Sequence, residues 1–356
     1  MTTLFDRLKI GNIELENRII IAPMTRSRAD DAGVQPDYAA DYYEQRASAG
    51  LIITEAVNVS PMAKGYVRTP GIYTEEQIES WRKVAEAVHA RGGKIFMQIF
   101  HTGRIALPDF LPEKHLPVAP SAVRAEGQNY TDAGMKDFVT PRELSADEIH
   151  ITVADFARAA KNAIRAGFDG VEIHGANGYL IQQFLSTNVN QRADEYGGSV
   201  ENRARFLFEI LDAVTAEIGA ERTGLKLSPG NTFNDIAESD AEELYRYIAE
   251  KLDGKNLAYL YVGTDDRTKD WHKFLRPIYD GVYFAGSGFT KESGSRLLAQ
   301  GGADAVVYGK LFLANPDLPE RFKLDAPLNE PDAATFYAGG RKGYVDYPFL
   351  AQALAV

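Results

Sequence analysis

The feature that most constrains the fold of this chain is a regular alternation of short β-branched runs with longer stretches of helical periodicity. Eight runs are expected to be strands, at residues 18–24, 51–57, 94–101, 170–174, 224–228, 259–262, 282–285 and 305–308. The intervening pattern predicts helices, coarsely at 37–49, 74–91, 146–166, 201–218, 240–252, 269–278, 291–300 and 316–322. Such alternation is the sequence signal of a parallel sheet with helical crossovers.

Several helix boundaries carry capping signals. Ser145 precedes Glu148 at capping-box spacing, and glycine pairs at 92–93 and 301–302 end two other helices ahead of apolar strands. Eight strand–helix repeats favour a closed barrel, with an open doubly wound sheet as the alternative. We therefore predict an α/β protein in which residues 1–356 form a single (β/α)₈ TIM barrel.

Two segments outside the repeat are also informative. Residues 8–10 and 13–15 are expected to pair across a tight Gly11-Asn12 turn, as a hairpin that caps the bottom of the barrel. Residues 102–144, after the third strand, are the longest irregular stretch and are rich in Pro, Gly and Ser. Loops of this length are usually functional or disordered, and here the loop rises from the face where barrels build active sites. We expect it to be a long active-site loop.

Composition narrows the chemistry. The absence of Cys excludes disulfides, Cys-ligated zinc, iron–sulfur clusters and a thiol nucleophile. No two of the six His residues have the spacing of a metal-binding helix, so no metal is expected. The formal charge of −11 disfavours binding to nucleic acid or to an anionic membrane. With no spanning apolar run and no leader-like start, a cytoplasmic location is expected, as a monomer or a homodimer.

The fourth predicted strand ends in a cluster of polar residues. His174 is followed by two small residues and then by Asn177 and Tyr179. A converging pair of donors such as His174 and Asn177 can polarise a carbonyl or nitro oxygen, and a nearby Tyr hydroxyl can act as a general acid. The alternative is a capped helix start with a core histidine, but the cluster of three favours a site.

Glycines follow the last two predicted strands. Gly286-Ser287-Gly288 and Gly309-Lys310 would expose backbone N–H groups, with Lys310 adding positive charge, as in many phosphate-binding barrels. Glycine at a strand-to-helix turn is common for steric reasons alone, so either segment by itself is weak evidence. Their joint position in the last two units favours a phosphate site.

Two other strand ends remain ambiguous on their own. Pro23-Met24-Thr25 ends the first strand, since Pro23 cannot extend a ladder, and a solvated basic loop is the alternative there. Gln98 near the end of the third strand would need a partner inside the barrel mouth. A cofactor carbonyl edge or a buried water would serve equally well.

Taken together, these residues resemble the Old Yellow Enzyme family, in particular ene-reductases similar to N-ethylmaleimide reductase. The matching segments follow in order along essentially the whole chain: residues 17–28, Gln98 to Arg104, HGANGYL at 174–180, DEYGGSVENRARF at 194–206, LFLANPDLPERF at 311–322 and GYVDYP at 343–348. The resemblance implies FMN held non-covalently at the C-terminal mouth and reduced by NADPH or NADH. Hydride from flavin N5 would then reach the β-carbon of an electron-poor alkene, such as an enone, enal, maleimide or nitroalkene.

The resemblance also implies roles for individual residues. The implied flavin-ring contacts are Pro23, Met24, Thr25, Ala56, Gln98 and Lys226, with Lys226 beside N1 and O2. The implied phosphate contacts are Gly286, Ser287, Gly288, Gly309 and Lys310. Catalysis would fall to His174 and Asn177, which bind the activating oxygen, and to Tyr179, which protonates the α-carbon. The implied substrate pocket also includes Tyr66, Phe100 and Tyr344.

Three positions depart from the commonest family pattern. Lys226 and Lys310 stand where Arg is usual and so lose its bidentate fork, and Phe100 stands where Trp is often found. Thr25 and the lack of Cys exclude the family branches that carry Cys at this position or iron–sulfur clusters. A flavin-free barrel isomerase or aldolase and a non-enzymatic flavin-binding protein remain as alternatives, which flavin colour and alkene turnover distinguish.

Overall fold

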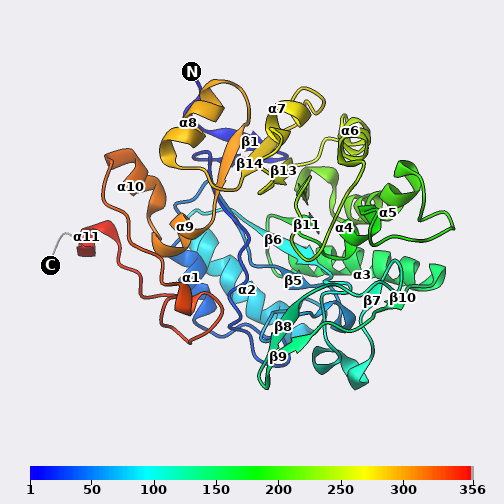
Figure 1. Ribbon diagram of the computed structural model, residues 1–356. Helices are drawn as coiled ribbons and strands as arrows, with labels where there is room; N and C mark the ends of the chain where they lie inside the picture. Colours follow the sequence, from blue (N-terminus) through cyan, green and yellow to red (C-terminus); the bar gives the residue numbers. More distant parts are fainter. Residues whose placement is uncertain (354–356) are drawn as a thin grey trace.

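The computed structural model describes residues 1–353, and its centre is a closed barrel of eight parallel strands (Figure 1). The barrel strands are β3 (Ile19–Ile21), β4 (Leu51–Ile53), β6 (Ile95–Phe100), β11 (Gly170–Gly175), β12 (Thr223–Leu227), β13 (Tyr259–Gly263), β14 (Tyr283–Gly286) and β15 (Ala305–Tyr308). They pair in chain order, and the β15–β3 pairing closes the cylinder. Each predicted strand overlaps one of them. The TIM-barrel prediction is therefore confirmed, and the open sheet is excluded.

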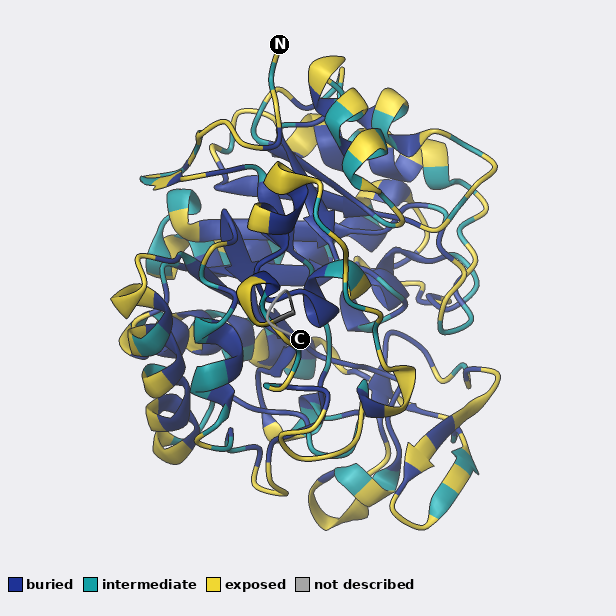
Figure 2. Cartoon of the chain, turned by 90° about the vertical axis from the view of Figure 1, so that its left-hand side faces the viewer, coloured by how far each residue is buried: buried dark blue, intermediate teal, exposed yellow. Residues whose placement is uncertain are grey.

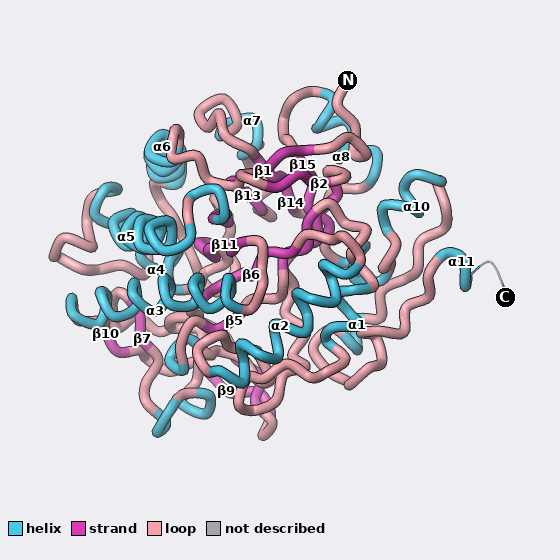
Figure 3. The backbone as a smooth tube through the Cα atoms, turned by 180° about the vertical axis from the view of Figure 1, so that it is seen from behind, coloured by secondary structure: helices cyan, strands magenta, loops and turns pink. Residues whose placement is uncertain are grey.

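Helices surround the barrel on the outside (Figure 3). Those that were predicted are α1 (Ala39–Glu44), α2 (Glu75–Ala90), α3 (Ala146–Arg165), α5 (Val200–Ile218), α6 (Ala241–Leu252), α7 (Trp271–Leu275), α8 (Lys291–Ala299) and α10 (Leu318–Leu324). The predicted capping box of Ser145 and Glu148 starts α3, and Thr74 and Gln77 form another at α2. Two short helices, α4 (Leu180–Leu185) and α9 (Lys310–Ala314), were not predicted, and α11 (Leu350–Ala353) follows α10. Five or six residues are too few for a helical period to stand out.

The barrel interior is filled from its N-terminal end. The strands β1 (Leu8–Ile10) and β2 (Ile13–Leu15) form the predicted antiparallel hairpin. Ile10 and Leu15 are fully buried in a cluster with Ile20, Leu51 and Phe96, which lie near the starts of their strands. Figure 2 shows the strands buried at the centre, with exposed residues on the outer helices and loops. Because the N-terminal end is plugged, a binding site is left to the C-terminal end.

The segment 102–144 is more ordered than a single irregular loop. It contains short 3₁₀ turns at Pro108–Phe110 and Pro112–Lys114. The strand β7 (Val118–Ala119) pairs in parallel with β10 (Arg142–Glu143), which lies near the end of the segment. Between them β8 (Gln128–Thr131) and β9 (Gly134–Asp137) form an antiparallel hairpin at the edge of the molecule (Figure 1). Strands of two to four residues carry too little alternation to be recognised in the sequence. The remaining short elements are β5 (Val57–Asn58), beside β6, and three 3₁₀ turns at Pro61–Ala63, Ala220–Arg222 and Ala333–Thr335.

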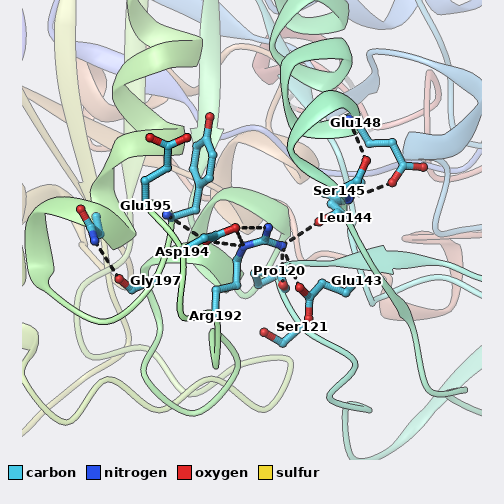
Figure 4. Close-up of polar contacts among 12 residues, drawn as sticks. Pro120, Ser121, Glu143, Leu144, Ser145, Glu148, Arg192, Asp194, Glu195 and Gly197 are labelled. Atoms are coloured by element: carbon cyan, nitrogen blue, oxygen red, sulfur yellow. Dashed lines mark hydrogen bonds and ion pairs between the residues drawn. The ribbon is translucent and has the colours of Figure 1, made fainter.

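A buried arginine fastens this segment to the barrel body (Figure 4). Arg192, whose side chain is 4% exposed, donates from Nη1 to the carbonyls of Pro120 and Leu144, at 3.0 and 2.7 Å. Its Nε donates to the carboxylate of Asp194 at 3.0 Å, which holds the pKa of Asp194 below its usual value. Arg192 therefore ties the β7 and β10 ends of the segment to the DEYGGS motif. That motif has a structural role here.

Replacing Arg192 with methionine is expected to lower the free energy of unfolding by about 2–4 kcal/mol, because two buried carbonyls lose their donor. Chemical denaturation followed by circular dichroism measures this change. The control is Arg158→Met, which removes a surface pair with Asp155 and should change stability by less than about 0.5 kcal/mol. Equal stability of Arg192→Met and the wild type would show that Arg192 does not fasten the segment.

Among residues 1–353, no helix is long and apolar enough to cross a lipid bilayer.

Candidate active site

A cavity of about 790 Å³ opens at the C-terminal ends of the barrel strands. This volume lies within the usual range for a small-molecule or cofactor site. The predicted site residues that line it are Pro23, Met24, Thr25, Ala56, Tyr66, Gln98, His174, Asn177, Tyr179 and Lys226. The structure therefore brings together, from five different strand ends and their loops, most of the side chains that the sequence singled out.

A buried polar cluster lies behind the cavity wall at Gln98. On β6, Gln98 donates from Nε2 to Oε1 of Glu172 on β11 at 2.6 Å, and Tyr259 on β13 donates its hydroxyl to Oε2 of Glu172 at 3.1 Å. The Tyr259 ring fits because Gly224 lies beside it, where a Cβ would come within 2.4 Å of the ring. Gln98 could be predicted from the sequence, but Glu172 could not, because its partners are distant in sequence.

Lys226 points its charge at the cavity. Its side chain is buried at 8% exposure, and its Nζ lies 5.2 Å from the centre of the Tyr261 ring. Within residues 1–353, Nζ has no hydrogen-bond partner and no carboxylate within 4.0 Å. Burial lowers the pKa of Lys226, while the nearby Glu172 opposes that shift. A buried cation without a protein partner is expected to bind an electron-rich group in the cavity.

His174 presents a neutral N–H donor. Its Nδ1 accepts the backbone N–H of Ala176 at 3.3 Å, so in the neutral ring the proton must be on Nε2. Burial, together with the positive charge of Lys226, holds the pKa of His174 well below its ordinary value of 6.5. The ring therefore stays neutral near pH 7 and can donate from Nε2.

Asn177 is held in an unusual backbone conformation with φ at +56°. Its N–H donates to Oγ of Ser228 at 2.8 Å, and its carbonyl accepts from Nδ2 of Asn234 at 2.8 Å. Oγ of Ser228 in turn donates to the amide of Gln182, which also donates to the carboxylate of Glu238. These bonds fix the backbone of Asn177 and leave its side-chain amide at the cavity. Ser228, Gln182 and Glu238 could not be recognised from the sequence as part of the site, because they act only through this turn.

Two tyrosines meet across the cavity. The hydroxyls of Tyr66 and Tyr179 are 3.0 Å apart, and burial raises the pKa of both above 10. Both are therefore protonated at neutral pH, and either can act as the donor in the shared bond. The ring of Tyr179 lies perpendicular to His174, with centroids 5.0 Å apart. A donor pair and a proton source thus surround the same space.

Two predicted pocket residues lie elsewhere. Among residues 1–353, those lining the cavity include neither Phe100 nor Tyr344. Phe100 is 1% exposed and stacks behind His174, with centroids 6.0 Å apart. Tyr344 is fully buried and stacks on Tyr42 at 4.1 Å, away from the cavity. Phe100 thus supports the wall, and in the segment after α10 the cavity is lined by Tyr337 rather than by Tyr344.

The position of Tyr337 follows from two arginines at the end of β3. Arg26 donates from Nη2 to the carbonyl of Gly343 at 2.9 Å, and Arg28 donates from Nη2 to the carbonyl of Thr335 at 2.8 Å. Both guanidinium groups also lie against the ring of Tyr344. These contacts bury Tyr344 as an anchor and leave Tyr337, which is 63% exposed, at the rim of the cavity.

The predicted phosphate-binding residues gather beside the main cavity. Gly286 ends β14 and Gly309 follows β15, and these strands are neighbours in the barrel. Ser287 and Gly288 line a second cavity of about 430 Å³ together with Arg267. Lys310 is exposed at the first residue of α9, where the helix N–H groups are free to bind an anion. The two glycine segments, predicted from the sequence to hold a phosphate, thus lie at the ends of neighbouring strands.

Comparison with known proteins identifies the family. The sequence profile of the NADH:flavin oxidoreductase / NADH oxidase family matches residues 3–329. The chain belongs to this family. It is 47% identical to 12-oxophytodienoate reductase 1 of Oryza sativa subsp. japonica, over 97% of this chain and 92% of that protein. It is also 47% identical to a probable flavin mononucleotide-dependent alkene reductase of Leishmania infantum, over 96% of each chain.

Solved structures agree with this flavin oxidoreductase assignment. The structure of morphinone reductase in complex with tetrahydroNAD superposes with a TM-score of 0.95 and 45% identity, over 98% of both chains. The Old Yellow Enzyme homologue from Zymomonas mobilis superposes with a TM-score of 0.95 and 40% identity, over 98% of this chain and all of the other. The predicted membership of the Old Yellow Enzyme family is confirmed.

Residues 1–353 of this family member contain no group of three or more His, Cys, Asp or Glu side chains placed to hold a metal ion.

Proposed function

We propose that this protein is an FMN-dependent ene-reductase that uses NADPH or NADH to reduce enones, enals, maleimides and nitroalkenes. The observation that carries the proposal is the convergence of two donors, His174 and Asn177, and a proton source, Tyr179, on one cavity that Lys226 also lines. The names of the rice and Leishmania relatives, and the tetrahydroNAD in the morphinone reductase complex, support it.

The residues of the cavity fit FMN. The unpartnered ammonium of Lys226 suits the pyrimidine edge of the ring, which becomes electron-rich on reduction. Gln98 and Ala56 would border the same edge, and Pro23, Met24 and Thr25 would border the ring from the end of β3. The phosphate would be held by Gly286, Ser287, Gly288, Gly309 and Lys310. Bound FMN would supply the hydride carrier between the nicotinamide and the alkene.

The protein's own groups would activate the alkene. The Nε2–H of His174 and the amide of Asn177 would bind the carbonyl or nitro oxygen and stabilise the negative charge that develops on it. Tyr179 would protonate the α-carbon. If Tyr66 donates in the bond between the two hydroxyls, the Tyr179 proton is left free to point into the cavity. At the rim, the exposed aromatic residues Tyr130, Phe233 and Tyr337 would cover a bound substrate and exclude water.

Isotope labelling tests this reaction. The FMN-reconstituted protein is given 2-cyclohexenone with a nicotinamide deuterated at its transferable hydrogen. The proposal predicts cyclohexanone labelled at the β-carbon and, in deuterated water with unlabelled nicotinamide, labelled at the α-carbon. Protein that stays colourless after FMN addition would instead support a flavin-free barrel isomerase or aldolase. Flavin-bound protein that forms no saturated ketone would support a non-enzymatic flavin-binding protein.

Replacing Lys226 with methionine is expected to weaken FMN binding by about 10- to 100-fold, which corresponds to a hydrogen bond from a charged group of about 1.5–3 kcal/mol. Titration of the apoprotein, followed by FMN fluorescence, measures the dissociation constant. Lys161→Met, on the outer face of α3 and paired with Glu217, is the matched control and should leave the affinity unchanged. An unchanged affinity in Lys226→Met would remove Lys226 from the flavin site.

A further inference from the structure

Glu172 is a fully buried carboxyl group to which the proposed mechanism gives no role. It lies on β11, two residues before His174, and its register partner on β6 is Gln98. Its two oxygens accept hydrogen bonds from the Gln98 amide and the Tyr259 hydroxyl, which are both neutral donors. A buried carboxylate with only neutral hydrogen-bond donors is costly, so its charge is sensitive to nearby charges.

The nearest cation does not neutralise Glu172 directly. On β12, the register partner of Glu172 is Gly224, two residues before Lys226. The Lys226 ammonium nevertheless lies more than 4.0 Å from both carboxylate oxygens of Glu172. The ammonium of Lys226 instead lines the cavity and lies over the ring of Tyr261. The ionisable groups facing Glu172 are therefore Lys226 on β12, Tyr259 and Tyr261 on β13, and His174 on its own strand.

We propose that Glu172 sets the charge behind the pyrimidine end of the bound flavin, by orienting Gln98 and opposing Lys226, and that it takes up one proton when the flavin is reduced. This inference rests on the proposed function, since it requires FMN in the cavity. Glu172 is a positioning residue here, because it acts through Gln98 and through its charge without lining the cavity.

The proton uptake follows from charge repulsion. Hydride transfer adds two electrons and one proton to the flavin and leaves a net negative charge next to Lys226. A second negative charge on Glu172 is then disfavoured, so the carboxylate takes a proton from solvent and returns it on reoxidation. Burial already raises the pKa of Glu172 to about 7, against the opposing effects of Lys226, Gln98 and Tyr259. Glu172 is thus largely ionised well above pH 7 and protonated well below it.

The test is the midpoint potential of the holoenzyme measured between pH 5.5 and 9 with redox dyes. When one proton is taken up per two electrons, the midpoint potential falls by about 30 mV per pH unit. The extra proton on Glu172 should steepen this slope toward twice that value above neutrality. Glu172→Gln keeps the size of the side chain but removes its charge. At pH 9 its midpoint should be higher than that of the wild type by at least about 30 mV, a tenfold change in the reduction equilibrium. At acid pH the two proteins should converge.

Tyr259→Phe provides a second variant that keeps the charge. It removes one hydrogen-bond donor from the carboxylate, so the pKa of Glu172 should rise. The pH at which the plot of midpoint potential against pH becomes steeper, called the break in the slope, should therefore move to higher pH. If Glu172→Gln has the wild-type midpoint and slope at every pH, or if it does not fold and Tyr259→Phe leaves the break unmoved, the inference is overturned. If wild-type protein binds no FMN or reduces no enone, the proposed function fails instead.

Discussion

Replacing Tyr179 with phenylalanine is expected to slow reduction of the alkene by about 10²- to 10⁴-fold, the usual contribution of a general acid. The ring of Tyr179 lies 5.0 Å from that of His174, centroid to centroid, and burial raises the pKa of Tyr179 above 10, so its proton is present throughout neutral pH. Reduction of the flavin by NADPH requires no proton from Tyr179 and should keep its wild-type rate. Anaerobic stopped-flow spectroscopy measures the two half-reactions separately.

Tyr66→Phe is the matched control for this prediction. It removes the partner hydroxyl at 3.0 Å but leaves the proposed donor, so it should slow alkene reduction much less than Tyr179→Phe. Full alkene reduction by Tyr179→Phe would remove Tyr179 as the proton donor. A larger loss in Tyr66→Phe than in Tyr179→Phe would transfer that role to Tyr66.

Removing both oxygen-binding donors is expected to have the second large effect. Loss of a single donor to a developing oxyanion costs about 10²- to 10³-fold in turnover, so His174→Ala combined with Asn177→Gly should lose at least that much. Glycine is chosen because φ at position 177 is +56°, where alanine would add backbone strain. The double variant should also bind phenols more weakly, measured as the change in the flavin spectrum on titration.

The control for the donor pair is Asn177→His. Histidine tolerates positive φ better than most residues and restores a donor, so this variant should keep most of the activity. Because the pKa of His174 lies well below 6.5, phenol binding should show no titration of His174 between pH 6 and 8. Unchanged phenol affinity in the double variant would exclude His174 and Asn177 from the oxygen-binding site.

The sequence predicted the features that depend on local pattern. Alternating strand and helix periods located all eight barrel strands, and a two-residue turn located the plug hairpin. Family motifs located His174, Asn177 and Tyr179, which the fold brings to one cavity. In each case the signal lies within one short segment of the sequence. The barrel then brings the separate strand ends together, because they all lie on the same face.

Features that depend on distant partners were missed. Glu172 sits in an apolar strand, and its importance follows from Gln98 and Tyr259, which are 74 and 87 residues away. Tyr337 and Tyr344 could not be distinguished from the sequence, because Arg26 and Arg28, more than 300 residues earlier, decide which tyrosine is buried. Long-range packing of this kind leaves no periodic signal in the chain.

The most direct test of the ene-reductase proposal is an anaerobic visible spectrum of the FMN-loaded protein, recorded before and after NADPH and again after 2-cyclohexenone. The proposal predicts flavin bands that bleach with NADPH and return with the enone, since both half-reactions would use the cavity lined by Lys226, His174 and Tyr179. Bands that bleach with NADPH but fail to return with 2-cyclohexenone, or with a maleimide or nitroalkene, would contradict it.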